Sequence, residues 1–185
     1  MSEAVAYLTV EEFLSIAERS ERNLELVNGR IYLVTGANLR HGVMTTLLAE
    51  ALAPSARARG CRRFMHGRLV RTGRATFYAP DVLITCGRIA HDQYETDPTL
   101  IIEVASPSTR NVDRREKAAA YAKIASLHLL LLVDPDERRI EGARMVDGEI
   151  GGWDVYGPGD LIITDFGDLN IDVLYDALDQ ETGDR

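Results

Sequence analysis

Apolar residues recur every three or four positions in three stretches of the chain, which is the spacing of a helix with one buried face. These stretches are residues 9–19, 38–58 and 113–125. In the first, Thr9 and Glu12 have the spacing of a capping box, in which each side chain bonds the backbone N–H of the other residue. The pattern therefore predicts three helices and places the start of the first at Thr9.

Runs of alternating or continuous apolar residues predict strands around these helices. They cover residues 24–27, 30–34, 61–70, 77–85, 100–105, 128–133, 139–145 and 149–156. Asn28-Gly29 and Asp147-Gly148 each separate two runs and predict hairpins, because these residues tolerate positive φ. The chain is expected to end with a short strand or two and a final helical turn near residues 173–178.

A buried strand, a helix and a second buried strand follow one another between residues 100 and 133, which indicates a crossover within a mixed sheet. With 185 residues, 45% of them hydrophobic, the chain is long enough to bury a sizeable core. The expected fold is α/β (α+β), a central mixed β-sheet flanked by α-helices. We expect it to form a single domain over residues 1–185.

Several classes of protein are disfavoured by what the sequence lacks. No apolar run reaches the roughly 18 residues of a membrane helix, and no export signal is visible at the N-terminus. Cys61 and Cys86 form no CxxC, no Cys/His cluster suggests zinc, and no glycine-rich loop suggests a nucleotide cofactor. A disulfide stays open, but the sequence favours reduced cysteines in a cytoplasmic protein with no membrane partner.

Charge is distributed unevenly along the chain. The net charge is −8, which argues against strong non-specific binding of nucleic acid. Residues 51–80, however, contain seven arginines and no acidic residue, whereas residues 160–185 contain eight acidic residues and Arg185 as their one basic residue. The arginine segment either engages phosphates or forms a solvated face that the acidic segment balances. Both interpretations stay open.

Two acids stand at consecutive predicted strands. Asp81 follows Pro80 at the start of one, and Glu103 lies inside the very apolar run Leu100–Val104. An ionised carboxylate in a buried strand is costly unless it is paired or bound to a cation. Glu103 is either a structural ion-pair partner or, together with Asp81, a ligand of Mg²⁺, which proteins commonly bind through one or two carboxylates, waters and substrate phosphates.

The helix that follows carries a candidate cation. Asp113, Lys117 and Tyr121 are spaced by four residues and share one helix face. Lys117 and Tyr121 can then point together toward the structure on which the helix packs. The competing interpretation is a surface ion pair between Asp113 and Lys117, worth only a few tenths of a kcal/mol.

Three further residues have weaker signals. Glu25 alternates with apolar neighbours, so it faces solvent on an edge strand or reaches the same metal. His41 lies near the start of the second predicted helix, where a surface or capping role is commoner than ligation. Ser106 opens the run Ser106–Thr109, whose hydroxyls, with free N–H groups of the next helix, are suited to contact phosphate.

A series of short motifs runs along the chain in a defined order. They are Leu24–Gly29, His41-Gly42, Pro80–Val82, Ile102–Val104, Ser106–Thr109, Asp113, Lys117, Tyr121 and Val133–Pro135. In this order and spacing they resemble the Uma2 family of endonucleases (DUF820), part of the restriction-endonuclease-like PD-(D/E)xK superfamily. The resemblance covers about residues 8–178, nearly the whole chain.

The resemblance implies a restriction-endonuclease-like core and Mg²⁺-dependent cleavage of phosphodiester bonds, with Mn²⁺ as a substitute. The nucleic acid it implies is DNA, and many members of the superfamily act as homodimers. It implies catalytic roles for Glu25, Asp81, Glu103 and Lys117, with the metal held by Asp81 and Glu103. The usual superfamily lysine would fall on Ala105, so this chain departs from the pattern and Lys117 takes that place.

The resemblance also gives Tyr121 a place among the site residues. Together with His41 and Ser106, it is a candidate for positioning the substrate. In the implied mechanism, Lys117 positions the attacking water and offsets charge on the phosphate.

Other functions are consistent with the same residues. A catalytically silent nucleic-acid-binding or regulatory module would keep the fold without turnover, and a structural homo-oligomer would use the acids in ion pairs. A glycosidase with paired acids gains little support from a sequence with 6% aromatic residues. The complete set of two acids, lysine and tyrosine favours the endonuclease.

Overall fold

The computed structural model describes residues 7–34, 38–105, 113–146 and 149–184, and only the backbone of residues 113–115. Its helices are α1 (Val10–Arg19), α2 (Leu39–Ala58), α3 (Asp113–Tyr121) and α4 (Ile171–Thr182). α1 begins with the predicted capping box, since Thr9 and Glu12 bond each other's backbone N–H groups. The three predicted helices are therefore confirmed, with one change at the end of α3.

The larger sheet has six strands in the order β11-β10-β9-β8-β6-β3. They are β3 (Arg62–Met65), β6 (Val82–Thr85), β8 (Leu100–Val104), β9 (Leu129–Asp134), β10 (Arg139–Val146) and β11 (Glu149–Tyr156). β8 and β9 run parallel, and the other neighbours run antiparallel. The sheet is therefore mixed, and α3 forms the predicted crossover between the two parallel strands.

The smaller sheet has five strands in the order β2-β1-β5-β4-β7. They are β1 (Leu24–Val27), β2 (Arg30–Leu33), β4 (Leu69–Gly73), β5 (Thr76–Tyr78) and β7 (Tyr94–Glu95), while β12 (Leu161–Ile162) and β13 (Leu169–Asn170) form a separate pair. The Asn28-Gly29 hairpin is confirmed, with φ of 50° and 80°. The antiparallel pairing of β10 with β11 is also confirmed, but residues 147–148, where its turn was predicted, lie outside the described residues.

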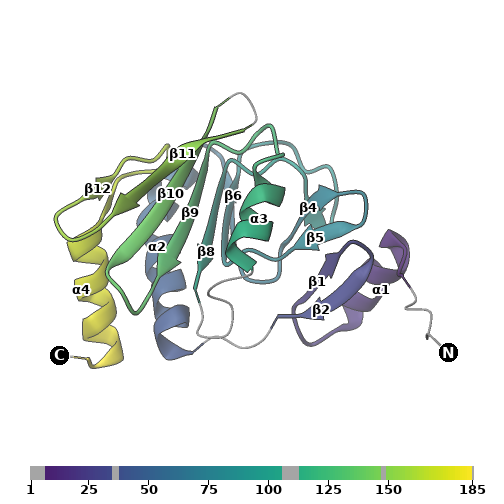
Figure 1. The fold of residues 1–185 in the computed structure, drawn as a ribbon, viewed down its shortest axis with the longest axis horizontal. Helices are drawn as coiled ribbons and strands as arrows, with labels where there is room; N and C mark the ends of the chain where they lie inside the picture. The colour runs from purple at the N-terminus through teal and green to yellow at the C-terminus, as the bar shows by residue number, and fades with distance from the viewer. Residues whose placement is uncertain (1–6, 35–37, 106–112, 147–148, 185) are drawn as a thin grey trace.

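Helices cover both faces of the larger sheet (Figure 1). Successive side chains of a strand point to opposite faces, so β8 sends Ile102 into the cluster formed with α2 and α4, and Ile101 into the cluster formed with α3. Phe13 of α1 packs against the smaller sheet in a third cluster. This is the predicted α+β architecture, a mixed sheet flanked by helices.

Two predicted boundaries are wrong. Residues 77–85 do not form one strand, because β5 and β6 belong to different sheets and Pro80 between them has no N–H for a ladder. α3 ends at Tyr121 rather than at residue 125, since the N–H groups of Lys123 and Ile124 bond carbonyls three residues back and tighten the chain into turns.

The expected reduced state of the two cysteines is also wrong, because Cys61 and Cys86 form a disulfide. The cause is strand register: Arg62 of β3 lies opposite Thr85 of β6, so the two cysteines just beyond this pair face each other with their Cα atoms 4.2 Å apart. The cytoplasmic location inferred from reduced cysteines loses that support. Within the described residues, no helix is both long and apolar enough to cross a bilayer.

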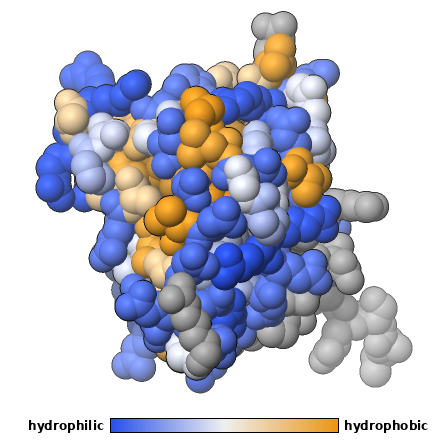
Figure 2. Space-filling view, turned by 90° about the vertical axis from the view of Figure 1, so that its left-hand side faces the viewer, coloured by the Kyte–Doolittle hydropathy of each residue, from blue (hydrophilic) through white to orange (hydrophobic). Residues whose placement is uncertain are grey.

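The acidic C-terminal segment forms α4, a helix of 12 residues where only a final turn was predicted. Its buried side chains pack on α2 and the larger sheet, and the side of the molecule on which α4 and β12 lie shows hydrophobic residues among hydrophilic ones (Figure 1 and Figure 2). Asp179 of α4 pairs with Arg40 of α2 at 3.0 Å and with Arg138 at 2.7 Å. Three of the eight acidic residues of this segment, Asp176, Asp179 and Asp184, therefore pair with Arg40 and Arg138 rather than with arginines of residues 51–80.

Candidate active site

The candidate site lies where the chain passes from the smaller sheet to the larger one. β5 ends at Tyr78, β6 begins at Val82, and Asp81 stands in the short link between them. The backbone N–H of Ala79, in this link, donates to Glu25 Oε1 of β1 at 3.0 Å. This hydrogen bond fixes the link to the smaller sheet, and Asp81 at the other end of the link directly precedes β6 of the larger sheet.

Asp81 and Glu103 are brought together by the pairing of β6 with β8. Val82 lies opposite Ile102, which places Asp81 beside Glu103 and Val104. The backbone N–H of Val104 donates to Asp81 Oδ2 at 2.7 Å and fixes the carboxylate against the end of β8. The structure therefore brings the two acids together at one end of neighbouring strands, as the sequence predicted.

α3 brings its lysine and tyrosine to the same point. The hydroxyl of Tyr121 donates to Glu103 Oε1 at 2.7 Å. Lys117 Nζ lies 2.8 Å from Glu25 Oε1 and 3.6 Å from Glu103 Oε1, and 5.5 Å from the centre of the Tyr78 ring. The spacing of four residues in α3 thus places both side chains over the acids, one turn of the helix apart.

Glu25 is buried rather than solvent-exposed. β1 lies between β2 and β5, so it is not the edge strand that one interpretation of the sequence required. Its carboxylate accepts from both Ala79 and Lys117. Glu25 therefore holds the lysine in place and joins the smaller sheet to the site.

His41 is also buried, which corrects the expectation of a surface or capping residue. The N-cap of α2 is Asn38, whose side chain accepts from the backbone N–H of His41. The ring Nε2 lies 3.3 Å from Asp81 Oδ2, whereas Nδ1 has no hydrogen-bond partner in the described part of the chain. The Asp81 carboxylate is therefore the contact that orients this ring.

The site is crowded with negative charge, and pKa values reflect this. Burial raises the pKa of Glu103 to about 7; Lys117 opposes the rise, and the charges of Asp81 and Glu25 add to it. Burial disfavours the charged form of His41, but its hydrogen bond to Asp81 and the negative charge around it outweigh this, so its pKa is raised. Burial and the nearby carboxylates hold the pKa of Tyr121 well above its usual value, so its hydroxyl stays a donor.

The residues present fit a hard divalent cation. Fully ionised, three carboxylates face one ammonium group and leave a formal charge of −2 with neutral histidines. Oδ1 of Asp81 and Oε2 of Glu103 accept no hydrogen bond from other described residues, so they are free to bind metal. Among the described residues, no group of three or more His, Cys, Asp or Glu side chains is arranged to hold a metal ion, so waters and substrate oxygens would have to supply most ligands of a cation held by Asp81 and Glu103.

Some functional neighbours carried no sequence signal. His66 Nδ1 lies 3.7 Å from Asp81 Oδ1, and His66 adopts φ of 50° in the turn between β3 and β4. The Tyr78 ring packs edge-on against Tyr121 at 5.6 Å. Both depend on how the two sheets meet, which periodicity does not reveal. Ser106, the remaining predicted site residue, lies outside the described residues.

The arginine segment is only partly available to phosphate. Arg68 pairs with Glu95 at 2.6 Å, and Arg62 lies 3.7 Å from the same carboxylate. Arg71 donates to carbonyls of its own turn. Three of the seven arginines are thus engaged within the protein, whereas Arg57, Arg59 and Arg74 are exposed, so both interpretations of the segment stay open.

Known proteins resemble this chain in sequence and in fold. The family model Uma2, described as "Putative restriction endonuclease", matches residues 10–173. Two proteins of Synechocystis sp. are similar in sequence: slr1290, 31% identical over 139 residues (72% of this chain and 72% of that protein), and sll1609, 29% identical over 143 residues (72% and 78%). Both are described as uncharacterized.

A solved structure shares the fold. The crystal structure of a "putative nuclease belonging to DUF820" from Anabaena variabilis superposes with a TM-score of 0.76 over 92% of this chain and 99% of that one, at 20% identity. At that identity the likeness concerns the fold alone. The match of the family model over most of the sequence, with the relative at 31% identity, shows that the chain belongs to the Uma2 family of restriction-endonuclease-like nucleases.

Proposed function

We propose that the protein is a Mg²⁺-dependent endonuclease that hydrolyses phosphodiester bonds of DNA, with Mn²⁺ able to replace Mg²⁺. The observation that carries this proposal is the convergence of Glu25, Asp81, Glu103 and Lys117 from both sheets and α3. It rests also on membership in a nuclease family. We take residues 1–185 to act as one domain, and dimer formation stays a prediction of the family resemblance.

In this proposal Asp81 and Glu103 hold the cation through Asp81 Oδ1 and Glu103 Oε2, which accept no hydrogen bond from other described residues. When bound, Mg²⁺ lowers the pKa of a coordinated water and offsets charge on the phosphoryl oxygens. The remaining residues hold these ligands: Tyr121 fixes Glu103 through its hydroxyl, and Val104 and His41 fix Asp81. Preorganised ligands need no rearrangement at the moment of reaction.

Lys117 is proposed to orient the attacking water and to offset phosphate charge. Its ammonium lies between Glu25 and Glu103, closer to Glu25, so that carboxylate sets its position. A charged lysine cannot accept a proton, so the water's proton passes to solvent or to a phosphate oxygen in this scheme. The position of Lys117 also explains how the chain manages without a lysine at Ala105.

The proposal is tested by incubating supercoiled plasmid with the protein and Mg²⁺, Mn²⁺ or EDTA. We expect nicked and linear DNA with either metal and intact plasmid with EDTA. Lys117 and Lys123 are the two lysines of the chain, and Lys123 is exposed beyond α3, so Lys123→Ala is a matched control for Lys117→Ala. If the protein cuts RNA but not DNA in the presence of metal, the proposed substrate is wrong and the protein is a ribonuclease. Salt-sensitive binding of DNA without cutting under either metal would favour the catalytically silent module instead.

A further inference from the structure

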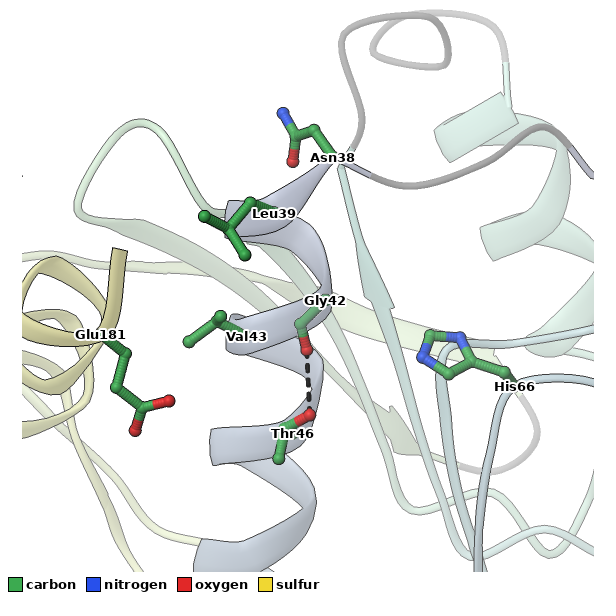
Figure 3. A pocket seen from close by; sticks show the side chains of 7 residues that line it. All are labelled: Asn38, Leu39, Gly42, Val43, Thr46, His66 and Glu181. Atoms are coloured by element: carbon green, nitrogen blue, oxygen red, sulfur yellow. Dashed lines mark hydrogen bonds between the residues drawn. The ribbon is translucent and has the colours of Figure 1, made fainter. Parts of the chain in front are cut away.

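An open depression of about 470 Å³ lies along the flank of α2, beside the candidate site (Figure 3). Its lining residues are Asn38, Leu39, Gly42, Val43, Thr46, His66 and Glu181. Most of them belong to the first two turns of α2, with His66 from the β3–β4 turn on one side and Glu181 of α4 on the other (Figure 3). The depression is thus a shallow surface across the side of one helix, bounded by two other elements.

One end of the depression reaches the carboxylates of the site. His66 Nδ1 lies 3.7 Å from Asp81 Oδ1. The side chain of His66 is 45% exposed, whereas those of Asp81 and Lys117 are 15% and 14% exposed. Of these three described side chains His66 is the most exposed, so we take a chain that places a phosphate at Asp81 and Glu103 to continue past His66.

The fold does not require a glycine at position 42, which forms the floor of the depression. Glycine in a helix interior is less favourable than alanine, and Gly42 does not occupy the left-handed region. A Cβ added there would meet no other atom within 4 Å. A side chain at this position would instead project into the open space of the depression, so the absence of one keeps that space free.

The chemistry of the lining differs between the two ends. At the end nearest the site, the ring of His66 supplies a donor. Leu39 and Val43 offer apolar surface beyond it, and the Glu181 carboxylate closes the far side. A phosphate suits the donor end only, while a sugar and base suit the apolar part, with Glu181 placed to accept from an exocyclic amino group.

We propose that this depression is a substrate subsite that binds the nucleotide flanking the scissile phosphate, with its phosphate at His66 and its base across Gly42 and Val43. The proposal rests on the proposed nuclease function and names where its substrate runs. Gly42 is a specificity-determining position of this subsite, because it supplies the room for the base.

The test replaces Gly42 with Leu and compares it with Ala51→Leu, which adds the same side chain at an exposed position of the same helix. Binding of a fluorescein-labelled DNA duplex is measured by anisotropy in EDTA, and cleavage of the same duplex is measured in Mn²⁺. We expect Gly42→Leu to weaken binding about tenfold, the size of effect expected for one lost base contact. Its melting temperature should equal or exceed that of the wild type, because leucine is the better helix former. Ala51→Leu should bind as the wild type does.

The outcomes separate the subsite from the nuclease function. If Gly42→Leu is folded and binds and cuts as the wild type does, the subsite is wrong and the nuclease stands. If the wild type binds DNA without cutting it, the nuclease is wrong, and the loss of binding in Gly42→Leu still decides the subsite. A wild type that neither binds nor cuts DNA overturns both. Equal weakening in Gly42→Leu and Ala51→Leu would overturn the subsite as well.

Discussion

Glu95 and Glu103, the second with its side chain 16% exposed, have opposite surroundings in this protein. Glu95 is 4% exposed and lies between two guanidinium groups, Arg68 at 2.6 Å and Arg62 at 3.7 Å. Glu103 lies among further carboxylates, those of Asp81 and Glu25, and Lys117 Nζ, a cation of the described residues, lies 3.6 Å from it. In the first cluster positive charge exceeds negative, and in the second negative exceeds positive.

This difference separates a structural ion pair from a site for chemistry. The cluster at Glu95 is satisfied by groups of the protein and ties the β3–β4 region to β7. Among the described side chains, the cluster at Glu103 carries a formal surplus of two negative charges when all three carboxylates are ionised and the histidines are neutral, and burial raises the pKa of Glu103 to about 7. A divalent cation would offset that negative charge. At Glu95 a cation would be repelled, because the two arginines already exceed the charge of the carboxylate.

The largest effect is expected from Asp81→Asn. The variant keeps the shape of the side chain but loses a metal ligand, so plasmid cleavage should fall about 10³-fold or more. Its free energy of unfolding should stay near the wild-type value or rise, because one of three repelling carboxylates is gone. A cleavage rate within about tenfold of the wild-type rate would show that Asp81 is not a metal ligand.

The converse experiment removes the acid of the other cluster. Glu95→Gln leaves two arginines without their carboxylate, and the free energy of unfolding should fall by about 3 kcal/mol. Cleavage per folded molecule should be unchanged below the melting temperature. If this variant is as stable as the wild type but no longer cuts DNA, the claim that the Glu95 cluster is structural is wrong.

Lys117→Ala should lower cleavage about 10²-fold, which is typical for loss of one electrostatic contact to the reacting phosphate. Lys123→Ala, its matched control, should cut at the wild-type rate. Because Lys117 also holds Glu25, both variants need a thermal melt. Equal cleavage by Lys117→Ala and Lys123→Ala would show that the ammonium has only a structural role.

A smaller effect is expected on how the free energy of unfolding depends on pH. The pKa of Glu103 rises from 4.5 to about 7 on folding, so the folded protein takes up a proton between these pH values. The contribution of Glu103 to stability is full below pH 4.5 and is lost as the pH rises through about 7. Between acid and neutral pH, the stability of Glu103→Gln relative to the wild type should rise by about 3 kcal/mol, because the variant lacks this loss. The free energy of unfolding of both proteins is measured by denaturant melts in EDTA. A difference between variant and wild type that stays constant with pH would contradict the raised pKa.

The smallest effect is expected from Tyr121→Phe, which removes the hydroxyl that donates to Glu103. Loss of a buried hydrogen bond should cost about 1 kcal/mol of unfolding free energy. Tyr156→Phe is the control, since its hydroxyl makes only a 3.5 Å contact with an exposed aspartate. The role of Tyr121 in holding Glu103 would be refuted by equal stabilities of the two variants together with unchanged cleavage by Tyr121→Phe.

The sequence predicted those parts of the site that depend on local spacing. Asp81 and Glu103 stand at the ends of successive apolar runs, and Lys117 and Tyr121 are four residues apart on a helix. Neighbouring strands and a crossover helix bring such positions together in most mixed sheets. Their metal-binding and catalytic roles stay predictions.

The parts that were missed depend on register and on the junction of two sheets. Burial of His41 and the contact of His66 with Asp81 follow from the packing of α2 and the β3–β4 turn around the larger sheet. The disulfide follows from the register of β3 on β6, which no local pattern gives. Prediction of one strand over residues 77–85 also hid the sheet junction at which Asp81 stands.

The most direct test of the account is a crystal of the protein soaked in Mn²⁺. We predict an anomalous-scattering peak within about 2.3 Å of Asp81 Oδ1 and Glu103 Oε2, with waters completing the coordination shell. No peak is expected at Glu95, where two arginines already surround the carboxylate. Full occupancy of Mn²⁺ elsewhere, with none at Asp81 and Glu103, would contradict the claim that the acidic cluster is a metal site.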